Sequence, residues 1–146
     1  MEYQVRKAIE KDKESIYHIK KYNNYPYVES IWGWNEEYQL SDFENDWIDR
    51  DKFYSIEDQG LLIGFYQIDY STYEINIEEL HIHPDYRGKR IGTTIIQNVI
   101  EQAHKSKQPI MIGCFKQNVG ALKLYEKVGF HRELETDTHF ILKLKP

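Results

Sequence analysis

The spacing of apolar residues along the chain changes between the period of a helix and the period of a strand, and each change marks an element. Residues 91–106 repeat apolar positions every three to four residues, which predicts an amphipathic helix. Its apolar stripe is made of Ile91, Ile95, Ile96, Val99 and Ala103. A second helix is predicted over 12–22, with Asp12 as a candidate N-cap. A third is predicted over 118–128, because Gly129 suits the position just after a helix end.

Alternating or short apolar runs predict strands between these helices. The predicted strands cover residues 3–8, 52–58, 61–70, 74–82, 109–115, 130–136 and 139–145. Gly60 is expected to take positive φ in a hairpin turn. In the fourth strand the alternation changes phase between Ile77 and Leu80, which indicates either a bulge or a strand covered on both faces.

An aromatic segment from Tyr22 to Tyr38 contains Pro26 and Gly33, and we expect a loop with short helical pieces there. A further helix is expected over 41–50, where Ser41 and the glutamate three residues later have the pattern of a capping box.

The order of predicted elements is strand, helices, three strands, helix, strand, helix and two strands, which indicates an α/β layered domain with a mixed sheet. The strand–helix–strand unit near the end requires a parallel pair joined by a right-handed crossover. The chain has 146 residues and contains no repeat or linker, so we expect one domain over residues 1–146.

Composition narrows the class of protein. The hydrophobic fraction is 40% and the charged fraction 29%, and no apolar run is long enough to cross a membrane. The net charge of −5 argues against nucleic acid as a partner. The N-terminal residues lack the pattern of a signal peptide, and Cys114 is the only cysteine, expected to be a buried structural thiol. These features predict a cytoplasmic protein.

Two glycines and three basic residues lie around the start of the helix at 91–106, in the segment Arg87–Gly92. The first N–H groups of a helix lack partners within the helix and attract anions. Gly88 and Gly92 let the backbone approach a ligand, while Arg87, Lys89 and Arg90 add positive charge. The turn therefore suits the diphosphate of a coenzyme, although a solvated basic turn fits the same residues. The Walker A and dinucleotide fingerprints are both absent.

Two motifs, LHIHPDYRGKRIG and NVGALKLYEKVGF, together resemble the two halves of the acetyl-coenzyme-A site in the GNAT superfamily of N-acetyltransferases. In the first motif Arg87 matches the leading residue and Gly92 the last, but Arg90 replaces the middle glycine. The second motif matches at every defining position. The resemblance implies a mixed, mostly antiparallel sheet with helices on both faces, and acetyl-CoA as co-substrate.

The resemblance also implies roles for individual residues. His81 and Ile82 lie where the family's strand parts from its neighbour and binds the pantetheine arm, and the Ile82 N–H is a candidate donor to the thioester oxygen. Asn118 would reach the pantetheine. The backbone N–H groups expected to hold the diphosphate belong to Gly88, Lys89, Arg90, Ile91, Gly92 and Thr93.

In this family an acceptor amine attacks the thioester directly while both substrates are bound. Tyr125 would then protonate the departing thiolate, since a phenol stays protonated at neutral pH. Glu79 is the first candidate for the general base, with Glu78 or a water as rivals. Some relatives that acetylate ribosomal-protein N-termini have a glutamate where this chain has Gly113, which argues against the same base arrangement.

The segment after the first strand lines the acceptor site in GNAT enzymes. Here Trp32, Trp34 and Glu36 are expected to contact a cationic amine through aromatic faces and a carboxylate. The same side chains would equally well pack in the core or form the surface of a homodimer. The acceptor stays open between a small amine, a peptide N-terminus and a lysine side chain.

Two other functions are compatible with the residues. The chain could be a non-catalytic acyl-CoA sensor on the same fold. Alternatively, His81 and His83, two apart on a strand, could bind a metal with Glu79. We expect an acetyltransferase without a metal, whose partners are acetyl-CoA and an amine rather than nucleic acid or membrane.

Overall fold

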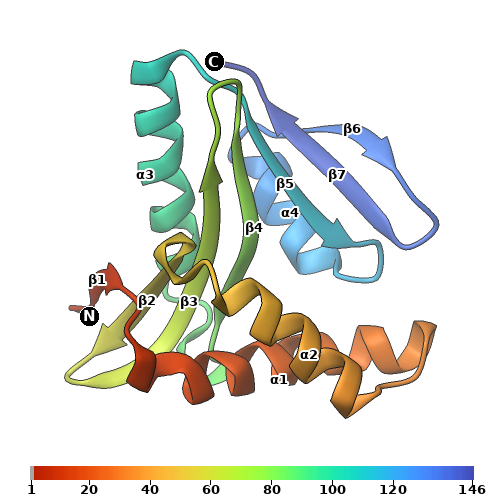
Figure 1. Cartoon of the computed structure of the whole chain (residues 1–146). Helices are drawn as coiled ribbons and strands as arrows, with labels where there is room; N and C mark the ends of the chain where they lie inside the picture. The colour runs from red at the N-terminus through yellow and green to blue at the C-terminus, as the bar shows by residue number, and fades with distance from the viewer. Residues whose placement is uncertain (1) are drawn as a thin grey trace. The chain divides into compact units, whose positions relative to one another are not determined.

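The computed structural model describes residues 2–146, which form a seven-stranded sheet and four α-helices (Figure 1). In sheet order, the strands are β1 (Gln4–Lys7), β2 (Phe53–Asp58), β3 (Leu61–Tyr70), β4 (Ile75–Ile82), β5 (Ile110–Phe115), β7 (His139–Leu144) and β6 (His131–Glu135). The β4–β5 pair is parallel, whereas β1–β2, β2–β3, β5–β7 and β6–β7 are antiparallel. The predicted fold class, a mixed and mostly antiparallel sheet with helices, is confirmed.

The chain divides into two compact units, and strands β3 and β4 pass through both. The first unit contains Met1–Gln67 and Glu79–Arg87, and the second contains Ile68–Glu78 and Gly88–Pro146. Helices α1 (Lys13–Ile31) and α2 (Glu36–Trp47) belong to the first unit. Helices α3 (Ile91–Ser106) and α4 (Val119–Lys127) belong to the second. None of the helices among residues 2–146 is both long and apolar enough to cross a membrane.

Aromatic rings form the core of the first unit. Phe43 of α2 lies 5.3 Å from the ring of Tyr17, 5.8 Å from Trp47 and 6.1 Å from Phe53, measured between ring centroids. The buried cluster consists of Ala8, Ile16, Tyr17, Ile19, Phe43, Trp47, Phe53 and Phe65. Helices α1 and α2 are therefore held on β2 and β3 by large apolar contacts.

The aromatic segment is helical over much of its length, so the prediction of a loop from Tyr22 is wrong. Helix α1 continues to Ile31 with Pro26 inside it. Proline removes one N–H donor from the helix ladder, at a cost of about 3 kcal/mol in an isolated helix. Val28, beyond the proline, is buried. Burial of the residues that follow offsets the local preference of Pro26.

Of two predicted helix starts, the one at Ser41 differs from the structure, whereas Asp12 occupies the N-cap position of α1 as expected. Asn35 caps α2 by accepting a hydrogen bond from the Tyr38 N–H at 2.9 Å, so Ser41 lies inside the helix and does not begin it. Asp12 precedes α1, but its side chain does not cap that helix. Its carboxylate instead accepts from Arg6 and from Ser55, because a buried carboxylate is stabilised most by a cationic donor.

The second unit follows its sequence pattern closely. The buried residues of α3 are the five predicted: Ile91, Ile95, Ile96, Val99 and Ala103. Gly129 follows α4 with φ +114°, as expected of a residue just after a helix end. Cys114 on β5 is buried, and burial raises the pKa of its thiol, which fits the structural role predicted.

The turn between β2 and β3 and the change of phase in β4 also agree with expectation. Gln59 and Gly60 have φ values of +51° and +82°, which is the pattern of a two-residue hairpin turn. In β4, His81 is buried on one face, while Leu80 and Ile82 are partly covered on the other. Coverage on both faces explains the change of phase seen in the sequence.

Candidate active site

The end of β4 is the structural centre of the candidate site. Among residues 2–146, the ladder between β4 and β5 joins Ile75–Ile77 with Ile110–Ile112, although β4 continues to Ile82. The His83 N–H donates to the carbonyl of Ile63 on β3 at 2.7 Å. Because successive N–H groups of a strand point to opposite sides, the Ile82 N–H points away from β3. This is the donor that the resemblance assigns to the thioester oxygen.

Side chains of helix α1 and of the glycine turn fix the carbonyl of Ile82. The amide nitrogen of Asn23 donates to that carbonyl at 3.3 Å, and Nε of Arg87 donates to it at 3.4 Å. Arg87 also donates from Nη2 to the Asn23 side-chain oxygen. Arg87, which sequence analysis assigned to coenzyme phosphate, therefore acts with Asn23 to hold the end of β4 against α1.

The turn before α3 combines left-handed backbone with a helix start that has no side-chain cap. Gly88 and Arg90 both have left-handed backbone angles, with φ of +77° and +64°. The first hydrogen bond of the helix runs from the Thr94 N–H to the Arg90 carbonyl, and no side chain caps α3 within the described chain. The N–H groups of Ile91, Gly92 and Thr93 precede that first bond and point outward from the helix end.

The structure explains why the family motif has a glycine where this chain has Arg90. A left-handed conformation costs a residue with a side chain about 1–2 kcal/mol, whereas glycine adopts it freely. Arg90 adopts it with φ +64° and ψ 18°. The replacement therefore keeps the shape of the turn, adds a positive charge and introduces backbone strain.

Glu79 lies on β4 with both carboxylate oxygens engaged. His81 donates from Nε2 to Glu79 Oε2 at 2.6 Å, and Lys20 of α1 lies 3.4 Å from Oε1. Burial alone would raise the pKa of the Glu79 carboxyl, but the attraction of Lys20 and His81 and their hydrogen bonds outweigh it and lower this pKa to about 2. Glu79 is therefore ionised throughout the physiological pH range.

Lys20 is the permanent counter-ion of Glu79. Its side chain is 13% exposed and also lies 3.9 Å from Asp46. Burial alone would lower the pKa of the Lys20 ammonium, but Glu79 and the aspartates of α2 raise it overall.

Sequence analysis missed Lys20 and Asn23. The signal was their spacing, because two polar residues three apart continue the inward face of α1 beyond Ile16 and Ile19.

Helix α4 places the predicted acid and the predicted pantetheine contact. Tyr125 is 6% exposed, and its ring lies 6.2 Å from Phe130. Asn118 caps the helix, since its side-chain oxygen accepts from the Ala121 N–H at 3.1 Å. This bond uses the side-chain oxygen of Asn118. Any contact between Asn118 and a coenzyme would therefore be made by its amide nitrogen.

The predicted acceptor residues hold a cation that belongs to the protein itself. Glu36 accepts from Tyr17 at 2.7 Å, from Lys21 at 2.7 Å and from Trp34 Nε1 at 2.8 Å. These hydrogen bonds, with that of Lys21 largest, lower the pKa of the Glu36 carboxyl to about 2. Lys21 also lies over the ring of Trp34, 5.7 Å from its centroid. Trp32, in contrast, is 62% exposed.

The geometry does not support the hypothesis that His81, His83 and Glu79 bind a metal. Both ring nitrogens of His81 are engaged, one with Glu79 and the other with Asn23. His83 Nδ1 accepts from the Asp85 N–H at 3.1 Å. Within residues 2–146, no group of three or more histidine, cysteine or acidic side chains is arranged to hold a metal ion.

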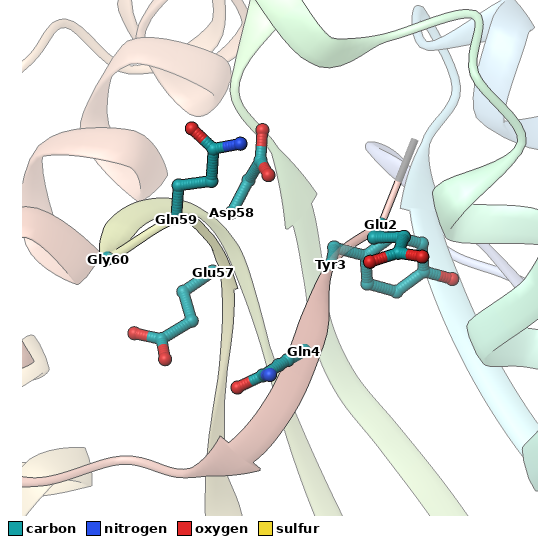
Figure 2. Close-up of a pocket in the computed structure, with 7 residues that line it drawn as sticks. All are labelled: Glu2, Tyr3, Gln4, Glu57, Asp58, Gln59 and Gly60. Atoms are coloured by element: carbon teal, nitrogen blue, oxygen red, sulfur yellow. The ribbon is translucent and has the colours of Figure 1, made fainter.

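Described residues of the first unit line at least two surface hollows. One, of about 930 Å³, lies beside β1 and the β2–β3 turn (Figure 2), and its lining residues are Glu2, Tyr3, Gln4, Glu57, Asp58, Gln59 and Gly60. None of the predicted site residues lines it. The other, of about 740 Å³, lies beside α1 and the residues that follow β4, and its lining includes Tyr22, Tyr25 and His83.

A mixed sheet with one parallel pair, followed by a helix whose N-terminus has no side-chain cap, defines an α/β domain. Comparison with known proteins gives the family. The model of the Acetyltransferase (GNAT) family matches residues 13–130, and the chain belongs to this family.

Relatives with similar sequences are also N-acetyltransferases by name. An uncharacterized N-acetyltransferase of Methanocaldococcus jannaschii is 33% identical over 94 residues, which is 58% of this chain and 41% of the relative. A thialysine N-epsilon-acetyltransferase of Mus musculus is 35% identical over 80 residues, 50% of this chain and 47% of the relative. The chain thus matches less than half the length of these curated relatives.

Solved structures share the fold. The PaiA N-acetyltransferase of Thermoplasma acidophilum, solved in complex with coenzyme A, has a TM-score of 0.77 at 21% identity, with all of both chains covered. The YncA protein of Salmonella typhimurium, solved with its cofactor acetyl-CoA, has a TM-score of 0.67 at 18% identity and covers 99% of this chain and 94% of its own.

Proposed function

We propose that this protein transfers the acetyl group of acetyl-CoA to a primary amine while both substrates are bound. The observation that carries the proposal is the turn before α3. Left-handed backbone at Gly88 and Arg90 leads into a helix start with no side-chain cap. Such a helix start, with basic residues beside it, is suited to the diphosphate of the coenzyme.

The reaction needs one new bond, one broken bond and two proton transfers. The amine nitrogen attacks the thioester carbon, and the Ile82 N–H stabilises the oxyanion that forms. The carbon–sulfur bond then breaks, Tyr125 donates its phenolic proton to the departing thiolate, and Glu79 accepts the proton lost by the nitrogen. The products are an N-acetylated amine and coenzyme A with a free thiol.

A carboxyl group with a pKa of about 2 is a weak base toward a free ammonium ion. The attacking nitrogen, however, becomes far more acidic as its bond to carbon forms and positive charge develops on it. Glu79 would therefore accept the proton during or after attack on the thioester.

The acceptor class is proposed from the site and from the relatives together. The name of the Mus musculus relative places acetylation on an N-epsilon amine, at the end of a side chain. In this chain, Trp32 is the exposed member of the three predicted acceptor contacts. Trp34 and Glu36 act indirectly, because they already hold Lys21.

Binding and turnover test the proposal separately. Titration of acetyl-CoA into the protein by calorimetry should give saturable binding, with desulfo-CoA binding as well and NAD giving no heat. A free-thiol assay should then detect coenzyme A released in the presence of amines such as thialysine or lysine. Binding without thiol release from any amine would favour a sensor, and no binding would reject the coenzyme site.

Tyr125→Phe tests the proton donor. It should lower turnover and leave acetyl-CoA affinity unchanged, because the ring that packs near Phe130 is retained. Turnover at the wild-type rate would remove Tyr125 from the mechanism.

Arg90→Gly and Arg90→Ala test the turn. Both variants lose one positive charge and should bind acetyl-CoA more weakly to a similar extent. Only the glycine variant relieves the left-handed strain, so it should be more stable than the alanine variant by about 1 kcal/mol in denaturant unfolding. Equal stability would show that the turn does not hold this conformation in solution.

A further inference from the structure

A continuous line of polar contacts runs from helix α1 through β4 to the first residue of the glycine turn. Lys20 lies 3.4 Å from Glu79, and His81 donates to Glu79 at 2.6 Å. Asn23 contacts Nδ1 of His81 through its amide nitrogen at 3.2 Å, and Arg87 donates to the Asn23 oxygen. We call these five residues the polar chain. All of them lie in the first unit.

The donors and acceptors of the polar chain determine where its protons lie. A guanidinium can only donate, so the group of Asn23 that faces Arg87 must be its oxygen. The amide nitrogen of Asn23 then faces His81, and an amide nitrogen can only donate. Nδ1 of His81 is therefore the acceptor and carries no proton. The imidazole proton is on Nε2 and is donated to the Glu79 carboxylate.

This arrangement distinguishes Glu79 from the neighbouring His81 as the side chain able to accept a proton. The lone pair on Nδ1 of His81 accepts from Asn23, so His81 acts as a donor to Glu79 and not as a base. Glu79 keeps its negative charge and is held at both oxygens by Lys20 and His81. The ring of His81 is itself fixed, since it stacks on Phe65 at 5.2 Å between centroids and is 8% exposed.

We infer that Asn23 is a positioning residue that sets the His81 tautomer and thereby makes Glu79 the proton acceptor of the reaction. Its second contact is to Arg87, so the orientation of the base depends on the residue that opens the glycine turn. This inference rests on the proposed function, because it assigns Asn23 a role in that chemistry. By analogy with the hydrogen-bonding partners of metal-bound histidines, its removal should lower activity by roughly 10–100-fold.

The first test needs no turnover. Nitrogen-15 NMR of the wild-type imidazoles, with His81 assigned from its missing signals in His81→Gln, should show an unprotonated Nδ1 and a protonated Nε2. In Asn23→Asp, a carboxylate would face Nδ1, so the spectrum should change to a ring protonated at both nitrogens. A wild-type ring with its proton on Nδ1 would overturn the inference.

Asn24 gives a matched control, since it lies on the same helix and outside the polar chain. Asn24→Asp introduces the same charge and should leave the His81 spectrum and turnover unchanged. Asn23→Asp and Asn23→Ala should lower kcat by roughly tenfold or more while the KM for the amine changes little. Equal effects at the two asparagines would show only a structural role for this part of α1.

The inference and the proposed function fail in different ways. If the wild-type protein releases no thiol with any amine, the proposed function fails, whatever the NMR result. If thiol is released and the tautomer is as inferred, but Asn23→Ala keeps the wild-type kcat and pH profile, then Asn23 does not position the base. A variant that does not fold leaves the wild-type spectrum as the deciding measurement.

Discussion

Two neighbouring lysines of helix α1 bind two carboxylates in very different surroundings. Lys21 meets Glu36 at the start of α2, and Lys20 meets Glu79 on β4. Both carboxyl groups have a pKa lowered to about 2. The Glu36 side chain, however, is 43% exposed and that of Glu79 is 24% exposed.

The difference shows that the role of an ion pair depends on the groups that its carboxylate contacts next. At Glu36 the contacts end at the surface, where Tyr17 and Trp34 complete a link between α1 and α2. Water can replace a lost partner there, so each contact stabilises little. At Glu79 the contacts continue through His81 toward the glycine turn, where a lost partner leaves a charge poorly solvated.

Replacing the two carboxylates gives the largest expected contrast. Glu79→Gln should lower turnover by roughly a hundredfold or more, because the amide cannot accept the proton from the attacking nitrogen. Calorimetry should show that acetyl-CoA affinity is retained. Glu36→Gln should change turnover by less than about threefold. A comparable loss at Glu36 would show that it contacts the acceptor directly.

Replacing the two lysines should shift the pH response of one pair more than the other. Without Lys20, burial would raise the pKa of Glu79 from about 2 toward or above its ordinary value of 4.5. Activity of Lys20→Met near pH 5 should then fall relative to neutral pH, because part of Glu79 is protonated. Lys21→Met should keep the wild-type profile of rate against pH. Identical profiles for the two variants would contradict the comparison.

The same pair also governs stability in acid. The folded-state pKa of Glu79 is below its ordinary value, so its carboxylate stabilises the fold above about pH 4.5, and this contribution is lost as the pH falls toward 2. Lys20→Met should lose about 2 kcal/mol at neutral pH, less than for a fully buried pair, and should show a weaker pH dependence in that window. Denaturant unfolding between pH 2 and pH 7 measures both.

Gly64→Ala is expected to disturb the polar chain from β3. A Cβ at this position would lie 2.6 Å from the backbone oxygen of His81, so one of the two strands must move. We expect a loss of about 1–3 kcal/mol in unfolding free energy and a lower kcat. Gly92→Ala is the control for stability, since its nearest contact would be 4.0 Å from Leu124. Wild-type stability of Gly64→Ala would show that β3 and β4 are less closely packed than described.

The smallest effect is expected from Trp34→Phe. This change removes the Nε1–H bond to Glu36 and keeps a ring over Lys21. We expect a loss of about 0.5 kcal/mol in unfolding free energy and a small rise in the pKa of Glu36, with turnover unchanged. Titration of the Glu36 carboxyl by NMR measures the shift, and a large loss of turnover would assign Trp34 to the acceptor site.

Elements with a regular apolar period were predictable from the sequence. Helix α3 begins and ends where the pattern of 91–106 does, and strands β3 to β5 lie within a residue or so of their predicted limits. Helix α1 was predicted too short, because Pro26 and a run of aromatic residues are typical of a loop in isolation. Its continuation depends on burial of residues such as Val28, which local preference does not reveal.

The fold class, the glycine turn and the family motifs depend on residue types at short, fixed spacings, so they were predictable before the structure was known. The contacts of each charged group depend instead on how distant elements pack together. Lys20 and Asn23 come from α1, while Glu79 and His81 come from β4, more than fifty residues later. No local pattern links residues so far apart in the chain, so only the packing of α1 on β4 revealed that Glu79 is held ionised and that His81 is a donor.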